Sequence, residues 1–178
     1  MQEMIDLYDH DRNRLDITIP REGAFLTEGQ FMLYVLAIIE APGGRFLVTQ
    51  RSLEKHWGAG WWEIPGGGVR AGETTLDAVQ REVPEETGLN LGDAELAVAY
   101  SYENVDLARG DNYIVDIYHV HLDFSPSDVR LVDGEAIDFR LCTWEDICQL
   151  NEESRVLHFE RIRQALTADG TLSDGTCR

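Results

Sequence analysis

Three glutamates lie close together in the sequence, at spacings that suit a cation site. Glu82, Glu85 and Glu86 are separated by i, i+3 and i+4, so on a helix their carboxylates are neighbours. Each pair of such anions repels by roughly 3 kcal/mol at about 5 Å and an effective dielectric constant of about 20. Arg81 supplies a single compensating charge. A divalent cation with oxygen ligands, Mg²⁺ above all beside phosphates, would offset the repulsion that remains.

The segment that carries these acids has the start and stop signals of a helix. Thr74 or Thr75 is a suitable N-cap, and Gly88 is a suitable residue just past the end. Pro84 lies inside the predicted helix, where it removes the hydrogen bond to the carbonyl of Gln80 and costs about 3 kcal/mol. We therefore expect a kink or an early loosening of the helix at Pro84.

Apolar residues at helical spacing predict which side of this helix faces the core. Leu76, Val79 and Val83 form the expected stripe. Glu86 falls about 50° from the centre of that stripe and Glu82 about 90°, whereas the third glutamate points further out. Two of the three carboxylates therefore lie at the edge of the buried side.

Aromatic residues gather in the segment that precedes the helix. Residues 52–63 contain Trp57, Trp61 and Trp62. Either the rings form a hydrophobic lid over the core, or one of them stacks on a nucleobase or another flat group. Both alternatives stay open, each for different rings.

The remaining chain reads as strands with a few inserted helices. Apolar and alternating patterns predict strands at 4–8, 15–19, 31–39, 46–51, 94–103, 113–124 and 137–142. A short helix capped by Thr143 and a final helix over 154–166 follow. We expect one domain over 1–178, with N-terminal strands and a loop in 1–30 and a frayed tail at 170–178.

Length and charge restrict the function. The 178 residues suffice for a sizeable core. A net charge of −18 argues against non-specific binding to nucleic acid or to an anionic membrane. The N-terminal residues lack the apolar region of a signal peptide, and no apolar run is long enough to span a bilayer. We therefore expect a cytoplasmic protein that acts on a small molecule.

The stretch 67–89, GGVRAGETTLDAVQREVPEETGL, resembles the Nudix box at every specified position. These positions are Gly67, Glu73, Arg81, Glu82, Val83, Glu85, Glu86, Gly88 and Leu89. The resemblance implies an α/β fold, namely an α/β/α sandwich with a mixed β-sheet and a loop–helix–loop catalytic motif. It also implies a hydrolase that splits the diphosphate linkage of a nucleoside diphosphate derivative.

The resemblance further implies roles for individual residues. Metal ligands for Mg²⁺, or alternatively Mn²⁺, would be Glu82, Glu85, Glu86 and the carbonyl of Gly66. Arg81 would orient the carboxylates, and Glu73 would hold the loop by pairing with Arg81. Glu82 is our first choice as the base that accepts a proton from water, with the loop residue Glu135 as a second candidate. Arg51 and Trp62 are the expected substrate-binding residues.

Several alternatives stay open. The domain could bind nucleotides without hydrolysing them, as a regulatory module. The N-terminal part is also similar to isopentenyl-diphosphate isomerases, although the turn EIPGGGV lacks the cysteine that this activity needs. His119 and His121 share one face of a strand, but a third metal ligand is not evident in the sequence. Neither the physiological substrate nor the oligomeric state can be read from the sequence, and a homodimer is the default expectation.

Overall fold

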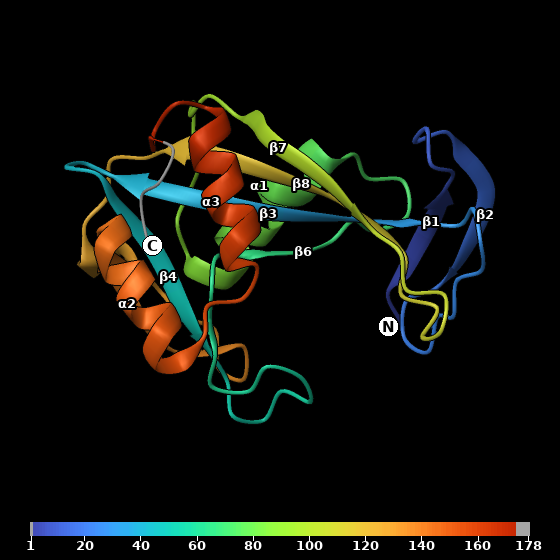
Figure 1. Ribbon diagram of the computed structural model, residues 1–178, viewed down its shortest axis with the longest axis horizontal. Helices are drawn as coiled ribbons and strands as arrows, with labels where there is room; N and C mark the ends of the chain where they lie inside the picture. Colours follow the sequence, from blue (N-terminus) through green and yellow to red (C-terminus); the bar gives the residue numbers. More distant parts are fainter. Residues whose placement is uncertain (1, 174–178) are drawn as a thin grey trace.

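The apolar run at 31–39 forms the central strand, as predicted. The structure is a computed structural model that describes residues 2–173. In it, β3 (Met32–Ala41) turns into β4 (Arg45–Arg51), with which it pairs antiparallel. On its other side β3 pairs in parallel with β8 (Tyr113–His121). Residues of β3 are buried on both faces because helices cover the sheet on both sides (Figure 1).

Seven strands make one mixed sheet. Its path runs β5-β4-β3-β8-β7, with β6 paired to β3 and β9 paired to β4. The strands not yet placed are β5 (Trp62–Glu63), β6 (Gly66–Gly68), β7 (Ala97–Asn104) and β9 (Ala136–Cys142). The β3–β8 pair is parallel and the other described pairs of this sheet are antiparallel.

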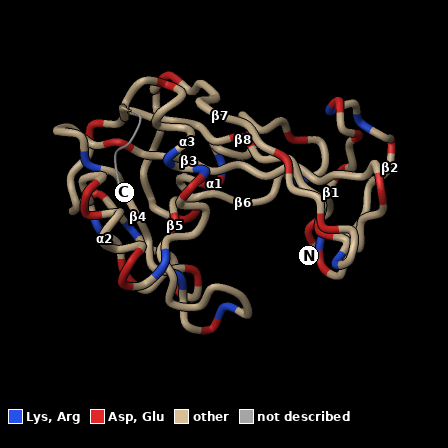
Figure 2. Tube along the Cα trace, viewed as in Figure 1, with Lys and Arg blue, Asp and Glu red and all other residues tan. Residues whose placement is uncertain are grey.

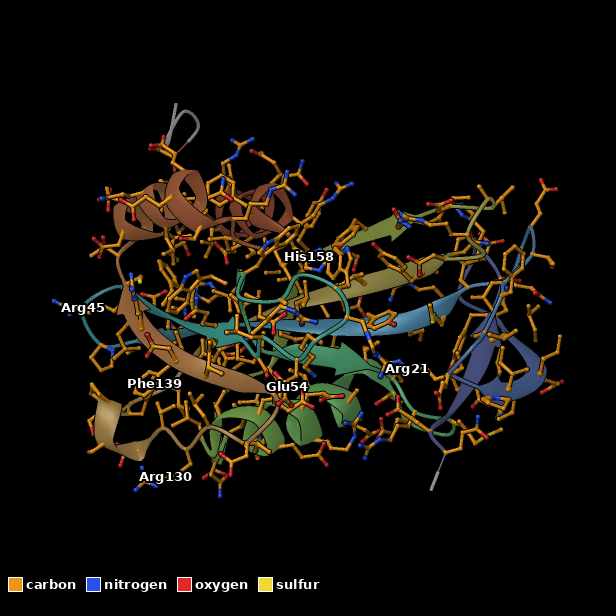
Figure 3. All side chains as sticks on the ribbon, turned by 90° about the horizontal axis from the view of Figure 1, so that it is seen from below. Arg21, Arg45, Glu54, Arg130, Phe139 and His158 are labelled. Atoms are coloured by element: carbon orange, nitrogen blue, oxygen red, sulfur yellow. The ribbon has the colours of Figure 1, made fainter. Side chains whose placement is uncertain are left out.

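Three helices complete an α/β/α sandwich. The first, α1 (Thr75–Thr87), packs on one face of the sheet, where Val79 and Val83 join a core cluster. On the opposite face lie α2 (Trp144–Ser154) and α3 (Phe159–Ala168), which bury Ile147 and Ile162 in a second cluster. Figure 3 shows the two layers of helix above and below the sheet. The predicted fold class is confirmed.

The N-terminal hairpin stands beside this sandwich. The strands β1 (Met4–Tyr8) and β2 (Arg14–Pro20) form their own two-stranded sheet. A bridge between Tyr8 and Phe31 connects the hairpin to the start of β3, and Ala71 donates its N–H to the carbonyl of Met4 at 2.8 Å. The hairpin therefore contacts the loop that leads into α1. A 3₁₀ turn, Pro126–Asp128, lies between β8 and β9.

The helix α1 ends where its cap predicts and not at its proline. Thr74 is the N-cap, and its side chain accepts from the N–H of Asp77. Gly88 ends the helix with a left-handed φ of 71°, a conformation that suits glycine. The predicted early loosening at Pro84 is wrong, because the N–H of Gly88 bonds the Pro84 carbonyl at 3.0 Å. Pro84 has no N–H to donate to the carbonyl of Gln80. Gln80 is exposed, so water can donate to that carbonyl instead.

Three other predictions need correction. Leu76 is 42% exposed, because the buried side of α1 is centred on Val79, Val83 and small Ala78. The strands at 94–103 and 113–124 are shorter than predicted, beginning at Ala97 and ending at His121. The final helix begins at 159 and not at 154, because the preceding residues at 155 and 158 have left-handed φ values of 64° and 58°.

The C-terminal end and the charge distribution complete the description. Of the predicted tail, residues 174–178 lie outside the described residues. Just before them, Leu172 donates its N–H to the carbonyl of Leu166 at 2.8 Å. Acidic residues are spread over the whole trace in Figure 2, so the net charge of −18 is not the property of one segment.

Candidate active site

The glycine strand β6 brings the acidic helix against the centre of the sheet. Its residues 66–68 pair antiparallel with residues 34–36 of β3. A Cβ atom on Gly67 would lie 2.3 Å from Oε1 of Glu82, and one on Gly66 would lie 2.2 Å from the carbonyl oxygen of Val35. A side chain at position 66 would require the β3 backbone to move, and one at position 67 would displace the Glu82 carboxylate. The Glu82 carboxylate consequently rests directly against the backbone of β6.

Arg81 ties the loop before α1 to the helix. Its Nε and Nη2 atoms donate to the two carboxylate oxygens of Glu73 at 2.7 and 2.9 Å, a bidentate geometry that fixes both groups. Nη1 donates to Glu82 at 2.6 Å and to Glu85 at 3.2 Å, and Nη2 also donates to the Gly68 carbonyl at 3.0 Å. The predicted pairing of Glu73 with Arg81 is confirmed.

The three helix acids differ in environment. The pKa of Glu86 is raised to about 8, mainly by burial and also by the nearby carboxylates of Glu63, Glu82 and Glu135, against the lowering effect of the hydrogen bond from Gly66. Burial also raises the pKa of Glu82, against the lowering effect of Arg81. The side chain of the third acid, at 85, is 51% exposed. The two acids nearest the sheet are therefore ionised only at a free-energy cost.

Two further carboxylates face this cluster from outside the helix. Glu63, at the end of β5, pairs with Arg51 at 2.7 Å, and burial raises its pKa. Glu135, in the loop before β9, pairs with Lys55. Glu135 contributes to the raised pKa of Glu86, which places the predicted loop acid within electrostatic reach of the cluster.

The donor set fits a hard divalent cation. The half-buried Glu86 carboxylate receives one hydrogen bond, 3.1 Å from the N–H of Gly66, although a carboxylate has about four acceptor sites. Glu82 receives its bond from Arg81. The remaining oxygen lone pairs provide the oxygen ligands that Mg²⁺ and Mn²⁺ prefer. A bound cation would also offset the repulsion between the carboxylates.

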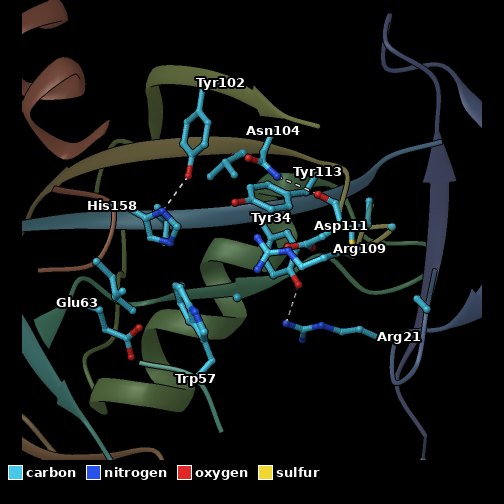
Figure 4. A pocket seen from close by; sticks show the side chains of 18 of the residues that line it. Arg21, Tyr34, Trp57, Glu63, Tyr102, Asn104, Arg109, Asp111, Tyr113 and His158 are labelled. Atoms are coloured by element: carbon cyan, nitrogen blue, oxygen red, sulfur yellow. Dashed lines mark hydrogen bonds between the residues drawn. The ribbon is translucent and has the colours of Figure 1, made fainter. Parts of the chain in front are cut away.

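A cavity of about 670 Å³ opens next to these acids. Gly66, Gly67 and Glu63 form the part of its wall that adjoins the acids. The remaining wall includes cations and aromatic rings that come from distant segments, namely Arg21, Tyr34, Arg51, Trp57, Tyr102, Arg109, Tyr113 and His158. Figure 4 shows the labelled side chains among them, such as Arg21, Tyr34 and His158, around one space. A cavity with flat apolar rings and positive charges suits a ligand that carries both an aromatic group and phosphate.

The structure separates the two predicted substrate-binding residues. Arg51 lines the cavity, as its prediction requires. Trp62 does not, because its side chain is 2% exposed and packs in the core cluster with α2 and α3. Arg140 lies over the Trp62 ring at 4.6 Å. The prediction for Trp62 is therefore wrong, and the exposed ring beside the cavity belongs to Trp57, which is 58% exposed.

Several cavity residues escaped the sequence analysis. Arg21 donates to the hydroxyl of Tyr34 at 3.3 Å, and the Tyr102 hydroxyl lies 3.1 Å from Nδ1 of His158. Burial lowers the pKa of His158, so this ring stays neutral and able both to donate and to accept a hydrogen bond. No local pattern marks these residues. Glu63 did carry a signal, since an acid directly before the glycine turn stands out in the apolar run WWEIP.

A family comparison decides what this arrangement belongs to. The model of the NUDIX domain matches residues 30–164, which include the seven-stranded sheet, the acidic helix, α2 and the first part of α3. The chain belongs to the Nudix family. Its Nudix box is the segment 67–89 described above, and hydrolases of this family depend on metal ions.

Similar proteins cover much of the chain. It is 38% identical to the putative 8-oxo-dGTP diphosphatase 2 of Mycobacterium tuberculosis, over 62% of this chain and 70% of that protein. It is 29% identical to the isopentenyl-diphosphate Delta-isomerase of Serratia proteamaculans, over 86% and 82%. The crystal structure of DR0079 from Deinococcus radiodurans superposes with a TM-score of 0.74 at 18% identity, over 92% and 99%.

These findings establish the class of activity. The Nudix protein is a diphosphate hydrolase that acts on acid anhydrides, within a family that acts on nucleoside diphosphate derivatives. In residues 2–173 no helix is both long enough and apolar enough to cross a membrane.

Proposed function

We propose that this Nudix protein hydrolyses the diphosphate linkage of a small nucleoside diphosphate derivative, by attack of water at phosphorus. One observation carries the proposal. The half-buried carboxylates of Glu82 and Glu86 lie next to a cavity lined with cations and aromatic rings. The acids suit the metal that the chemistry requires, and the cavity suits the nucleotide.

The metal site would comprise Glu82, Glu85, Glu86 and the carbonyl of Gly66. Mg²⁺ is the proposed ion and Mn²⁺ the alternative. A divalent cation held there offsets the charge on the phosphate oxygens and lowers the pKa of a bound water. Glu85 is half exposed. An ion bound beside it would therefore be open to water or substrate on the side that faces solvent.

Residues of the chain perform the other steps. Glu82 accepts the proton of the attacking water, and Arg81 holds that carboxylate in place through its 2.6 Å contact. Glu73 in turn fixes Arg81 through the bidentate pair. Arg51 binds a phosphate oxygen from the cavity wall. Glu135, within electrostatic reach of Glu86, is the second candidate for the base.

The base of the nucleotide would occupy the aromatic part of the cavity. Trp57 is the most exposed ring there, and stacking on a flat group is what such a ring does well. The neutral His158 and its partner Tyr102 offer a hydrogen-bond donor and acceptor for the edge of a base. Selection among nucleosides would therefore depend on residues outside the Nudix box.

Two alternatives give distinct results in a single experiment. Purified protein with Mg²⁺ is offered a panel of nucleoside diphosphate derivatives and isopentenyl diphosphate, and the products are separated by chromatography. We expect cleavage of a nucleotide, lost in Glu85→Gln. Binding of nucleotides without turnover would show a regulatory module. Isomerisation of isopentenyl diphosphate would favour the activity of the Serratia relative.

The same preparation addresses the assembly state. We propose that residues 1–178 act as a single domain, and that the chain forms a homodimer, the commonest arrangement of soluble oligomers. Light scattering during size-exclusion chromatography measures the mass of the particle. A mass of about 20 kDa, that of one 20.1 kDa chain, would exclude the dimer.

A further inference from the structure

A second group of metal-binding side chains lies at the far end of the sheet. Glu40 is at the end of β3, and His119 and His121 are at the end of the parallel neighbour β8. Register pairs Glu40 with His121 and Ile38 with His119, and paired residues point to the same face of a sheet. Ile38 is buried with α2 and α3, so all three side chains project to that face, opposite to α1.

We propose that Glu40, His119 and His121 form a Zn²⁺ site separate from the Nudix box. One ligand atom of each side chain lies within 4.8 Å of the others. The Glu40 oxygen Oε2 is 2.8 Å from Nε2 of His119 and 3.6 Å from Nδ1 of His121. Ligands on a tetrahedral ion at about 2.0 Å from zinc are about 3.3 Å apart, so these distances bracket the required value.

A fourth residue orients the central histidine. Nδ1 of His119 lies 2.7 Å from Oδ2 of Asp169, at the C-terminal end of α3. A neutral imidazole has one N–H, so it can donate to only one of the two carboxylates that flank it. Donation to Asp169 leaves the Nε2 lone pair directed toward Glu40, where an ion between the two would satisfy both. Carboxylates in this position typically strengthen metal binding by histidine.

Burial and charge also favour an ion of this kind. The side chain of His119 is 6% exposed and that of Glu40 is 16% exposed, so both ligands are held in place. His121 is 73% exposed and leaves a path from solvent. The two carboxylates at 40 and 169 bring two negative charges beside two imidazoles, and imidazole with carboxylate is a ligand set that zinc accepts.

The proposed site is distant from the reaction. Gly66 contacts β3 at Leu36, and Glu40 lies four residues further along, about 13 Å at 3.3 Å per residue. An ion bound there would join β3 to β8 and, through Asp169, to the end of α3. Its expected role is to stabilise the folded state, since any ligand that binds only the folded chain does so.

The test counts zinc ions. The protein is dialysed to equilibrium against increasing Zn²⁺ in excess Mg²⁺, and bound zinc per chain is measured for the wild type, His121→Ala and His10→Ala. His10 is the matched control, because it is 76% exposed and also contacts a carboxylate, that of Glu103. We expect His121→Ala to hold one ion fewer than the wild type at saturation, and His10→Ala to hold the same number.

Two further measurements test whether the zinc is bound at this site. Zinc should raise the melting temperature of the wild type and of His10→Ala by more than that of His121→Ala. Asp169→Asn keeps the three proposed ligands, so it should still bind this zinc ion, with an affinity lowered by roughly 10- to 100-fold. Equal zinc content in the wild type and His121→Ala, or no zinc bound by the wild type, would overturn the proposal.

Discussion

Replacing Glu86 by glutamine should stabilise the metal-free protein while abolishing its activity. The Glu86 carboxylate is largely removed from solvent beside other acids and accepts a hydrogen bond from the N–H of Gly66 at 3.1 Å. Glutamine has nearly the same shape, and its amide oxygen can accept that bond. The substitution therefore removes a charge that the fold disfavours and keeps the packing and the hydrogen bond.

The size of the effect follows from the pKa. The pKa of Glu86 is raised from 4.5 to about 8, so between these values the folded chain holds a proton that the unfolded chain has released. Stability of the wild type then falls as pH rises through this window. At 1.36 kcal/mol per pH unit the ceiling is about 5 kcal/mol above pH 8. Counter-ions screen part of this repulsion, and we expect about 2–4 kcal/mol.

The assay is urea unfolding in a chelator at pH 5 and at pH 9. Glu86→Gln should exceed the wild type by about 2–4 kcal/mol at pH 9 and by less than about 1 kcal/mol at pH 5. Adding Mg²⁺ should stabilise the wild type at pH 9 more than the variant, because the ion binds the folded carboxylate. Turnover in Mg²⁺ should be lost in the variant.

Glu85→Gln is the matched control. It removes the charge of an acid that is 51% exposed on the same helix, and exposed substitutions usually change stability by no more than about 0.5 kcal/mol. Two results would contradict this reasoning. One is a stability difference between the wild type and Glu86→Gln that does not change with pH, and the other is a variant less stable than the wild type at pH 9. Either would show that desolvation and neighbouring acids do not disfavour the charge on Glu86.

Three other predictions use the same preparations. Gly67→Ala places a Cβ 2.3 Å from Oε1 of Glu82 and so displaces that carboxylate. The kcat should fall by about 10²-fold, the typical effect of misplacing a reacting group by about 1 Å. Unchanged kinetics would contradict the close approach. Arg81→Lys loses the bidentate pair and should lower kcat by a similar factor of about 10², measured against the best substrate of the panel; a change in KM alone would disagree. Trp62→Ala should lower the free energy of unfolding in urea by about 3–5 kcal/mol. Trp57→Ala should change that stability by less than about 1 kcal/mol and raise KM. The opposite pattern would place Trp57 in the core and Trp62 at the cavity.

Local signals account for what the sequence predicted well. The caps at Thr74 and Thr143 and the stop at Gly88 involve groups close along the chain. Each depends on hydrogen bonds that neighbouring residues can make without help from the rest of the fold. The central strand was equally clear, because a continuous apolar run suits burial on both faces.

Predictions failed where packing overrides local pattern. Pro84 has a poor intrinsic propensity, yet α1 continues past it to its glycine cap, because packing against the sheet holds the helix together. Trp57 and Trp62 have the same chemistry and lie in one segment. Pairing of β5 with β4 turns Trp62 into the core and leaves Trp57 in the loop at the cavity, a difference that composition alone does not contain.

The sequence by itself determined the family and the acidic helix and predicted a metal site, because the Nudix box is contiguous and its three helix glutamates lie within about one turn of one another. Only the tertiary structure brought Arg21, Tyr102 and His158 to the cavity, and Glu40 beside His119. These residues are far apart in the chain, and the places of Tyr102, Glu40 and His119 depend on the register of β3, β7 and β8. Strand register is decided by burial across the whole sheet, so no short stretch of sequence records it.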